Sequence, residues 1–143
     1  MRKVIRSALM PYSPAQMFDV IIDVLAYPDF LPWCASSEIL SQDDKSMVAR
    51  LEIAKSGLRQ SFTTRNEFDR PASMEITLVE GPFTELSGSW KFEPLGEDGC
   101  KVSMDLQFDF NSALLGMTLA GVFEMVADKM VDAFCDRADV LYE

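Results

Sequence analysis

Apolar and polar residues alternate with a period of two through the middle of the chain, between residues 46 and 110. This period is typical of β-strands that bury one face. Turns containing glycine or proline divide the region, and the pattern predicts strands at residues 46–54, 58–69, 74–80, 85–93 and 100–110. Residues 2–10 alternate less regularly but suit one more strand, first in the chain or at an edge. Short turns between these segments indicate consecutive antiparallel strands of one sheet.

A helical pattern, with apolar residues three and four positions apart, precedes the strands. Ser13 suits the N-cap, Pro14 suits the first helical position, and Gln16 completes a capping box. The helix is expected to run to about Leu25. Its inward face is predicted to consist of Met17, Val20, Ile21 and Val24.

The same helical period returns from about Ser112 and continues to the end of the chain without a proline. Asn111 or Ser112 is expected to cap this second helix. Its apolar stripe consists of Leu115, Leu119, Val122, Val126, Met130 and Phe134. About thirty residues at 1.5 Å each give a length of roughly 45 Å, and a helix of that length needs a long concave surface to cover its apolar face. A twisted sheet that curls around the helix would supply it, and Gly88 inside a strand fits a bend or a close backbone approach.

The segment Tyr27-Pro28-Asp29-Phe30-Leu31-Pro32-Trp33-Cys34 is unusual for a connection between elements. It is more apolar than surface loops are, and two prolines make it unsuitable for the interior of a helix or strand. We expect Phe30 and Trp33 to form a movable gate at the mouth of an apolar cavity, with the prolines as stiff hinges. The alternative is a buried corner that closes one end of a solid core.

Three polar side chains share an otherwise apolar face of the strand at residues 58–69, namely Gln60, Thr64 and Asn66. Specific polar groups in an apolar pocket fix the orientation of small ligands. The alternative is that they bond to neighbouring strands or lie near a solvated end of the sheet. The aromatic residues expected to line the same ligand site are Phe62, Trp90, Phe92, Phe108 and Phe123. For each aromatic residue, ordinary core packing is the competing interpretation.

Composition narrows the chemistry that the chain can perform. It has 143 residues, which fits one domain spanning residues 1–143. The absence of histidine removes Ser-His-Asp and Cys-His arrangements and the usual general base near neutral pH, so an enzyme is not expected. Cys34, Cys100 and Cys135 are odd in number and far apart, which favours reduced thiols over disulfides or a zinc site. No catalytic residue and no metal ligand is predicted.

Charge is unevenly distributed along the acidic chain, whose net charge is −10. Residues 45–65 carry five basic side chains against Glu52 alone, a local charge of +4. The basic residues are Lys45, Arg50, Lys55, Arg59 and Arg65. This segment is interpreted either as the solvated face of a hairpin or as a docking patch for anionic lipid or ribosomal RNA.

Several motifs in this order resemble one protein family. They are Pro11-Tyr12-Ser13, the segment at residues 27–34, Phe62-Thr63-Thr64-Arg65-Asn66, Leu78-Val79-Glu80-Gly81-Pro82-Phe83, the residues Leu86, Gly88, Trp90 and Phe92 at alternate positions, Val122-Phe123-Glu124, and Met130-Val131 followed by Ala133-Phe134. The chain is similar to the START-like, helix-grip superfamily of the polyketide cyclase/dehydrase type. More narrowly, it resembles the branch that holds coenzyme-Q-binding START-domain proteins and bacterial ribosome-association toxins.

The resemblance implies an α+β fold in which a curved antiparallel sheet of about six to seven strands wraps around the long C-terminal helix. It also implies an elongated apolar cavity between sheet and helix, and no defined catalytic set. Mitochondrial members carry a targeting sequence that this chain lacks, so a cytoplasmic bacterial protein is expected. We expect a monomer.

Two functions follow from the resemblance. The first is binding of an isoprenoid quinone such as ubiquinone, or a related lipid, by a carrier or chaperone that supports respiration. The second is association with the large ribosomal subunit that blocks subunit joining. No cofactor is required in either case, ubiquinone being a bound ligand, and transient contact with a membrane surface is a further expected interaction.

Overall fold

The structure is a computed structural model that describes residues 2–55, 57–110 and 113–143. For residues 113–120 it describes the backbone alone. The elements in chain order are β1 (Arg2–Met10), α1 (Pro14–Ile22), η1 (Val24–Ala26), α2 (Tyr27–Phe30), β2 (Cys34–Gln42), β3 (Ser46–Lys55), β4 (Leu58–Asp69), β5 (Ser73–Glu80), β6 (Phe83–Leu95), β7 (Gly99–Phe110) and α3 (Ala113–Tyr142).

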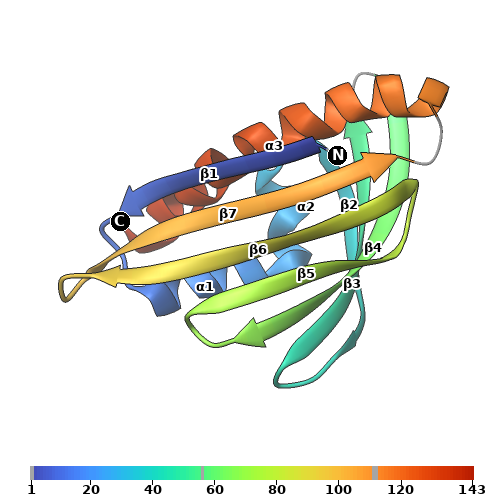
Figure 1. The fold of residues 1–143 in the computed structure, drawn as a ribbon. Helices are drawn as coiled ribbons and strands as arrows, with labels where there is room; N and C mark the ends of the chain where they lie inside the picture. Colours follow the sequence, from blue (N-terminus) through green and yellow to red (C-terminus); the bar gives the residue numbers. More distant parts are fainter. Residues whose placement is uncertain (1, 56, 111–112) are drawn as a thin grey trace.

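The seven strands form one antiparallel sheet in the order β1-β7-β6-β5-β4-β3-β2. Strands β2 to β7 therefore pair in sequence, and β1 is added beside β7. The sheet curls strongly, with β2, β3 and β4 steeply inclined to β1 and β7, and the helices lie on its concave side (Figure 1). This arrangement confirms the predicted α+β helix-grip fold.

Strand β2 has no counterpart among the predicted strands. It pairs with β3 at the edge of the sheet, and its register shifts between Cys34 and Ser36 and again between Ile39 and Ser41. These irregularities break the two-residue alternation, and most of its side chains are exposed. Pairing with β3 holds this strand rather than burial of one face, so the sequence pattern gave no signal.

The first helix is shorter than predicted. The capping box is present, with the Gln16 N–H donating to Ser13 Oγ at 3.2 Å, but α1 ends at Ile22 instead of about Leu25. The backbone of Asp23 leaves the helical conformation, with ψ at 68°, and the chain turns into η1. This turn lets Val24 become buried.

The segment at residues 27–34 was predicted to be a connection unsuitable for the interior of a helix or strand, and its first half contains a helical turn that the sequence did not predict. Tyr27–Phe30 form α2, a single helical turn. Pro28 lies in this first turn, where its missing N–H needs no partner, so the proline does not interrupt the element. Within the same segment, Leu31 and Trp33 are buried in the core.

Phe134 anchors the C-terminal half of α3 to the concave side. Its ring centroid lies 5.3 Å from that of Tyr27, 5.6 Å from that of Phe30 and 5.4 Å from that of Trp90. All three contacts are edge-on, a favourable geometry for aromatic pairs. Helix α3 is thereby packed against both α2 and the sheet at one place.

Phe123 forms a second aromatic anchor, nearer the start of α3. Its ring centroid lies 4.8 Å from that of Phe108, 5.0 Å from that of Phe83 and 5.9 Å from that of Phe62. Eleven positions separate Phe123 from Phe134, which corresponds to about 16 Å along the helix axis. The helix is therefore held against the sheet at two separated clusters of rings.

Ion pairs join α3 to the edge strand β1. Arg2 Nη1 lies 2.6 Å from Glu124 Oε2, and Arg6 pairs with Asp128 one turn further along the helix. All four side chains are about half exposed, so each pair contributes little to stability. The pairs fix which side of α3 faces β1 more than they hold the fold together.

The end of α3 is tied to the corner between β1 and α1. The Tyr12 hydroxyl donates to Asp139 Oδ1 at 2.7 Å, and the Tyr142 hydroxyl donates to the Gln16 carbonyl at 3.0 Å. The bond to the Asp139 carboxylate favours the protonated phenol and raises the pKa of Tyr12 to about 12. Both hydroxyls thus remain donors at neutral pH.

The apolar stripe predicted on the second helix is confirmed where side chains are described. Val122, Val126 and Phe134 are buried, and Met130 is partly buried. The predicted cap at Asn111 or Ser112 lies outside the described residues, as do the side chains of Leu115 and Leu119.

Gly88 provides a test of how tightly the sheet is built. A Cβ at this position would lie 2.8 Å from the Asp105 carbonyl oxygen and 2.9 Å from Leu106 Cδ1. We predict that Gly88→Ala lowers the free energy of unfolding by about 1–3 kcal/mol, because the backbone of β7 must move. Urea denaturation measures this change.

Gly121→Ala is the matched control, since a Cβ at Gly121 meets no atom within 4 Å. Gly121 lies on an exposed position of α3, and alanine there should stabilise the protein by about 0.5–1 kcal/mol. Equal effects of the two substitutions would contradict the close approach at Gly88.

Candidate functional site

A small cavity of about 70 Å³ lies between the concave sheet and α3. Its wall is largely aliphatic and aromatic and comes from η1, α2, five strands and α3. The lining residues are Val24, Tyr27, Ala49, Leu51, Phe62, Thr64, Asn66, Met74, Ile76, Leu86, Trp90, Leu106, Phe123 and Met130. Along α3 the wall includes Phe123 and Met130, so the cavity lies in the stretch between the two aromatic anchors.

Thr64 and Asn66 are the polar members of this wall, apart from the hydroxyl of Tyr27 and the indole N–H of Trp90. They lie two positions apart on β4 and therefore share its inner face. The Thr64 hydroxyl donates to Asn66 Oδ1 at 3.0 Å, and both side chains are buried. Among the described residues, the Asn66 amide nitrogen makes no hydrogen bond. The pair therefore offers hydrogen-bond donors to a molecule in the cavity.

Tyr27 is the one ionisable residue of the described cavity wall. Its hydroxyl donates to the Ile21 carbonyl oxygen, and burial raises its pKa far above the ordinary value. Burial also raises the pKa of the Cys34 and Cys135 thiols to about 11, and neither thiol lines the cavity. The cavity wall can therefore enclose and orient an apolar molecule, but it carries no group that exchanges protons near neutral pH.

Half of the ten residues predicted to bind a ligand line this cavity: Phe62, Thr64, Asn66, Trp90 and Phe123. Three others lie elsewhere. Gln60 borders another hollow beside the first half of β4, Phe92 packs edge-on against Phe18 with centroids 5.6 Å apart, and Phe108 packs against Phe123.

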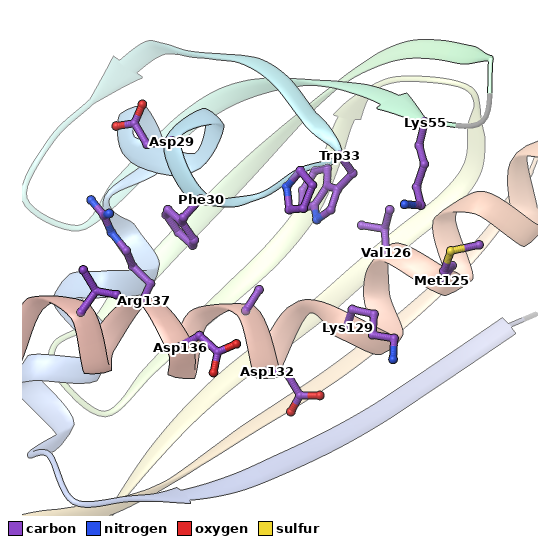
Figure 2. A pocket seen from close by; sticks show the side chains of 13 residues that line it. Asp29, Phe30, Trp33, Lys55, Met125, Val126, Lys129, Asp132, Asp136 and Arg137 are labelled. Carbon is purple, nitrogen blue, oxygen red and sulfur yellow. The ribbon is translucent and has the colours of Figure 1, made fainter.

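The remaining two, Phe30 and Trp33, line a groove of about 630 Å³ between α2 and α3. Figure 2 shows both rings directed from the α2 side toward α3. The groove and the cavity have no lining residue in common. The segment predicted to form a gate thus lies between a surface groove and the core, beside the helix that covers the cavity.

Sequence reasoning missed much of the cavity wall and most of the groove. Val24 and Met130 were expected to face inward, but nothing in their pattern marked them as cavity residues. The strand alternation also placed Ile76, Leu86 and Leu106 on the inner face, without distinguishing a cavity wall from solid core. Lys129 and Arg137 carry no sequence signal for the groove, because the path of α2 decides which side of α3 is uncovered.

The positive segment at residues 45–65 is partly neutralised in the folded protein. Arg50 Nη1 lies 3.0 Å from Glu38 Oε1, and Arg59 Nη1 lies 2.8 Å from Glu52 Oε1. Lys55 is directed to the groove instead of the outer face of the sheet (Figure 2). The basic residues therefore do not form one continuous patch.

In the part of the chain that the structure describes, no helix is long and apolar enough to cross a membrane. The same residues contain no cluster of three or more Cys, Asp or Glu side chains able to hold a metal ion.

A curved antiparallel sheet that grips a long C-terminal helix, with an apolar cavity between them, defines the START-like class of proteins. The chain belongs to the polyketide cyclase / dehydrase and lipid transport family, whose model matches residues 10–135.

Two of the relatives found by comparison with known proteins carry names of different kinds. A protein of Pseudomonas aeruginosa named ribosome association toxin RatA is 50% identical over 137 residues, covering 96% of this chain and 95% of that protein. The mitochondrial coenzyme Q-binding protein coq10 of Schizosaccharomyces pombe is 27% identical, covering 96% of this chain and 87% of that protein.

Among solved structures, the Zhui aromatase/cyclase of a Streptomyces species superposes with a TM-score of 0.85 at 21% identity. The superposition covers 96% of this chain and 93% of the cyclase. This likeness shows the shared fold.

Thr64→Val tests the buried polar pair. The substitution removes the hydroxyl that donates to Asn66 and leaves a buried carbonyl oxygen without its partner. We predict a loss of about 1–2 kcal/mol in the free energy of unfolding, measured by urea denaturation. Combining it with Asn66→Leu should cost less than the sum of the single changes, because both remove the same bond.

Thr77→Val is the control for these substitutions. Thr77 is on the neighbouring strand, and its hydroxyl makes only a long, exposed contact of 3.5 Å with the Arg65 carbonyl oxygen. Its effect should stay within about 0.5 kcal/mol. Additive losses for Thr64 and Asn66 would contradict the pairing.

Proposed function

We propose that this protein binds a hydrophobic small molecule of the isoprenoid quinone class between the sheet and α3. Its role is that of a cytoplasmic carrier or chaperone that supports respiration without catalysing a reaction. The observation that carries the proposal is the buried Thr64–Asn66 pair on the wall of an otherwise apolar cavity. A quinone carbonyl accepts hydrogen bonds, and the Asn66 amide is a hydrogen-bond donor on an otherwise apolar cavity wall.

The size of the cavity sets a condition on this function. Small-molecule pockets usually measure about 300–1,000 Å³, so a cavity of about 70 Å³ admits only part of such a ligand. Binding therefore requires the wall to move. Met74 and Met130 belong to that wall, and methionine side chains repack readily. The weak ion pairs between β1 and α3 also permit a small shift of the helix.

The relatives support this proposal in part. A full-length relative, although only 27% identical, is named for binding coenzyme Q. The family description includes lipid transport. Neither relative reported above is named as an enzyme.

Quinone binding is tested with a short-chain ubiquinone. In a Trp33→Phe variant, Trp90 on the cavity wall is the remaining tryptophan and its fluorescence should fall as quinone binds. Asn66→Leu should weaken binding about three- to tenfold, because one hydrogen bond in an apolar site is lost. Solvent extraction and mass spectrometry of the purified protein provide an independent measurement.

Gln60→Leu is the matched control, since Gln60 lies on the same strand but outside the cavity. It should leave the affinity unchanged. Protein that carries no quinone after purification and fails to quench on titration would refute the proposal.

A second candidate function is association with the large ribosomal subunit. The observation that favours it is the name of the relative that is 50% identical across nearly the whole chain. Within this protein, Arg59 and Arg65 are the basic residues on the outer face of β4, the face turned away from the cavity.

Sedimentation with purified large subunits tests the second candidate. If these arginines contact ribosomal RNA, replacing both by glutamate should strongly reduce co-sedimentation and make the residual binding less sensitive to salt. Lys91→Glu with Lys101→Glu, on β6 and β7, is the control pair and should have little effect. Absence of the natural protein from the subunit fraction would rule this function out.

A further inference from the structure

The groove between α2 and α3 has a distribution of charge that the quinone proposal does not explain. At one end Lys55, from the end of β3, and Lys129, from α3, lie on either side of Val126 (Figure 2). At the other end are Asp29, Asp136 and Arg137. The two ends of one groove therefore differ in the sign of their charge.

The two lysines are not engaged elsewhere in the described part of the chain. Neither of them forms an ion pair with a described carboxylate, whereas Arg137 lies over the ring of Phe30, with Cζ 5.0 Å from its centroid. Among the described residues Lys45, Lys91 and Lys101 also form no ion pair, and what sets Lys55 and Lys129 apart is that both line the same groove in a chain with a net charge of −10. They supply six N–H donors to an anion.

Between the lysines and the far end, most of the groove wall is apolar, and Asp132 is its one acidic member in that stretch. Phe30 and Trp33 form one side, and Val126 and Ala133 form the other. From Met125 to Val140 the groove follows α3 for about 22 Å, and its volume of about 630 Å³ lies within the range of ligand pockets. An elongated groove with apolar side chains on both sides fits an alkyl chain better than a compact ring.

We propose that this groove binds a single-chain anionic amphiphile, with a carboxylate or phosphate head between Lys55 and Lys129 and its alkyl chain along Trp33, Val126 and Phe30. The ligand is a monomer and not the surface of a bilayer. Asp29, Asp132 and Asp136 also line the groove, and the whole chain is acidic, so an extended anionic surface is repelled. A single head group at the basic end meets mainly the two lysines.

The test measures binding of dodecanoate and of dodecanol, both below the concentrations at which they aggregate. A Trp90→Phe variant leaves Trp33 as its one tryptophan, so its fluorescence reports on the groove. Isothermal titration calorimetry on the unaltered chain repeats the measurement without that substitution. Dodecanoate should bind at least about tenfold more tightly than dodecanol, because the alcohol cannot pair with the lysines.

Lys55→Met and Lys129→Met should each weaken dodecanoate binding about three- to fivefold, and the double variant at least about tenfold, with dodecanol unaffected. Lys91→Met is the matched control, since Lys91 is exposed on β6 and does not line the groove. It should change neither affinity.

Equal affinities for the acid and the alcohol, or an unchanged affinity in the double variant, would overturn the proposal. So would flotation of the protein with phosphatidylglycerol vesicles in the absence of dodecanoate binding, which would assign the lysines to a bilayer surface. The outcome does not depend on quinone binding, because Trp90 reports on the cavity and Trp33 on the groove.

Discussion

The structure depends on the burial of the apolar face of α3 against the concave side of the sheet. Phe123 and Phe134 make this contact through two clusters of aromatic rings, and the residues of α3 between them have no aromatic side chain. The two clusters set the distance between α3 and strands β4, β5 and β6. The aliphatic residues between the clusters do not completely fill the volume between helix and sheet. The cavity is thus a consequence of how the helix is supported. A ligand site in this position needs no loop of its own, because the core elements create it.

The buried Thr64–Asn66 pair contributes less net stability than an apolar pair at the same positions would. Buried polar groups contribute little net stability even when they are bonded, and an apolar pair of the same shape packs equally well. Their position beside an incompletely filled space is therefore consistent with the proposed ligand site. Met74 on β5 and Met130 on α3 also line the cavity, and their flexible side chains can repack.

The local arrangement of charged side chains in this protein differs from what its net charge indicates. The net charge of −10 disfavours binding to polyanions, and the ion pairs of Arg50 and Arg59 divide the positive segment seen in the sequence. The two lysines at the groove are brought together from β3 and α3 by the fold alone. Relatives named for ribosome association and for coenzyme Q binding share this scaffold, and the difference between those activities must lie in such local features of the surface and the cavity.

The sequence by itself determined the element order, six of the seven strands, the long terminal helix and the inward face of β4, because period and turn residues are local properties. It did not reveal β2, whose bulges break the alternation, nor the helical turn at Tyr27–Phe30. Only the tertiary structure decided which inward residues border empty space: Phe62 and Trp90 line the cavity, whereas Phe92 and Phe108 fill solid core. Burial is encoded residue by residue along the chain, but a void depends on how far apart two packed elements are held. That distance is set jointly by side chains from distant segments, which no local pattern records.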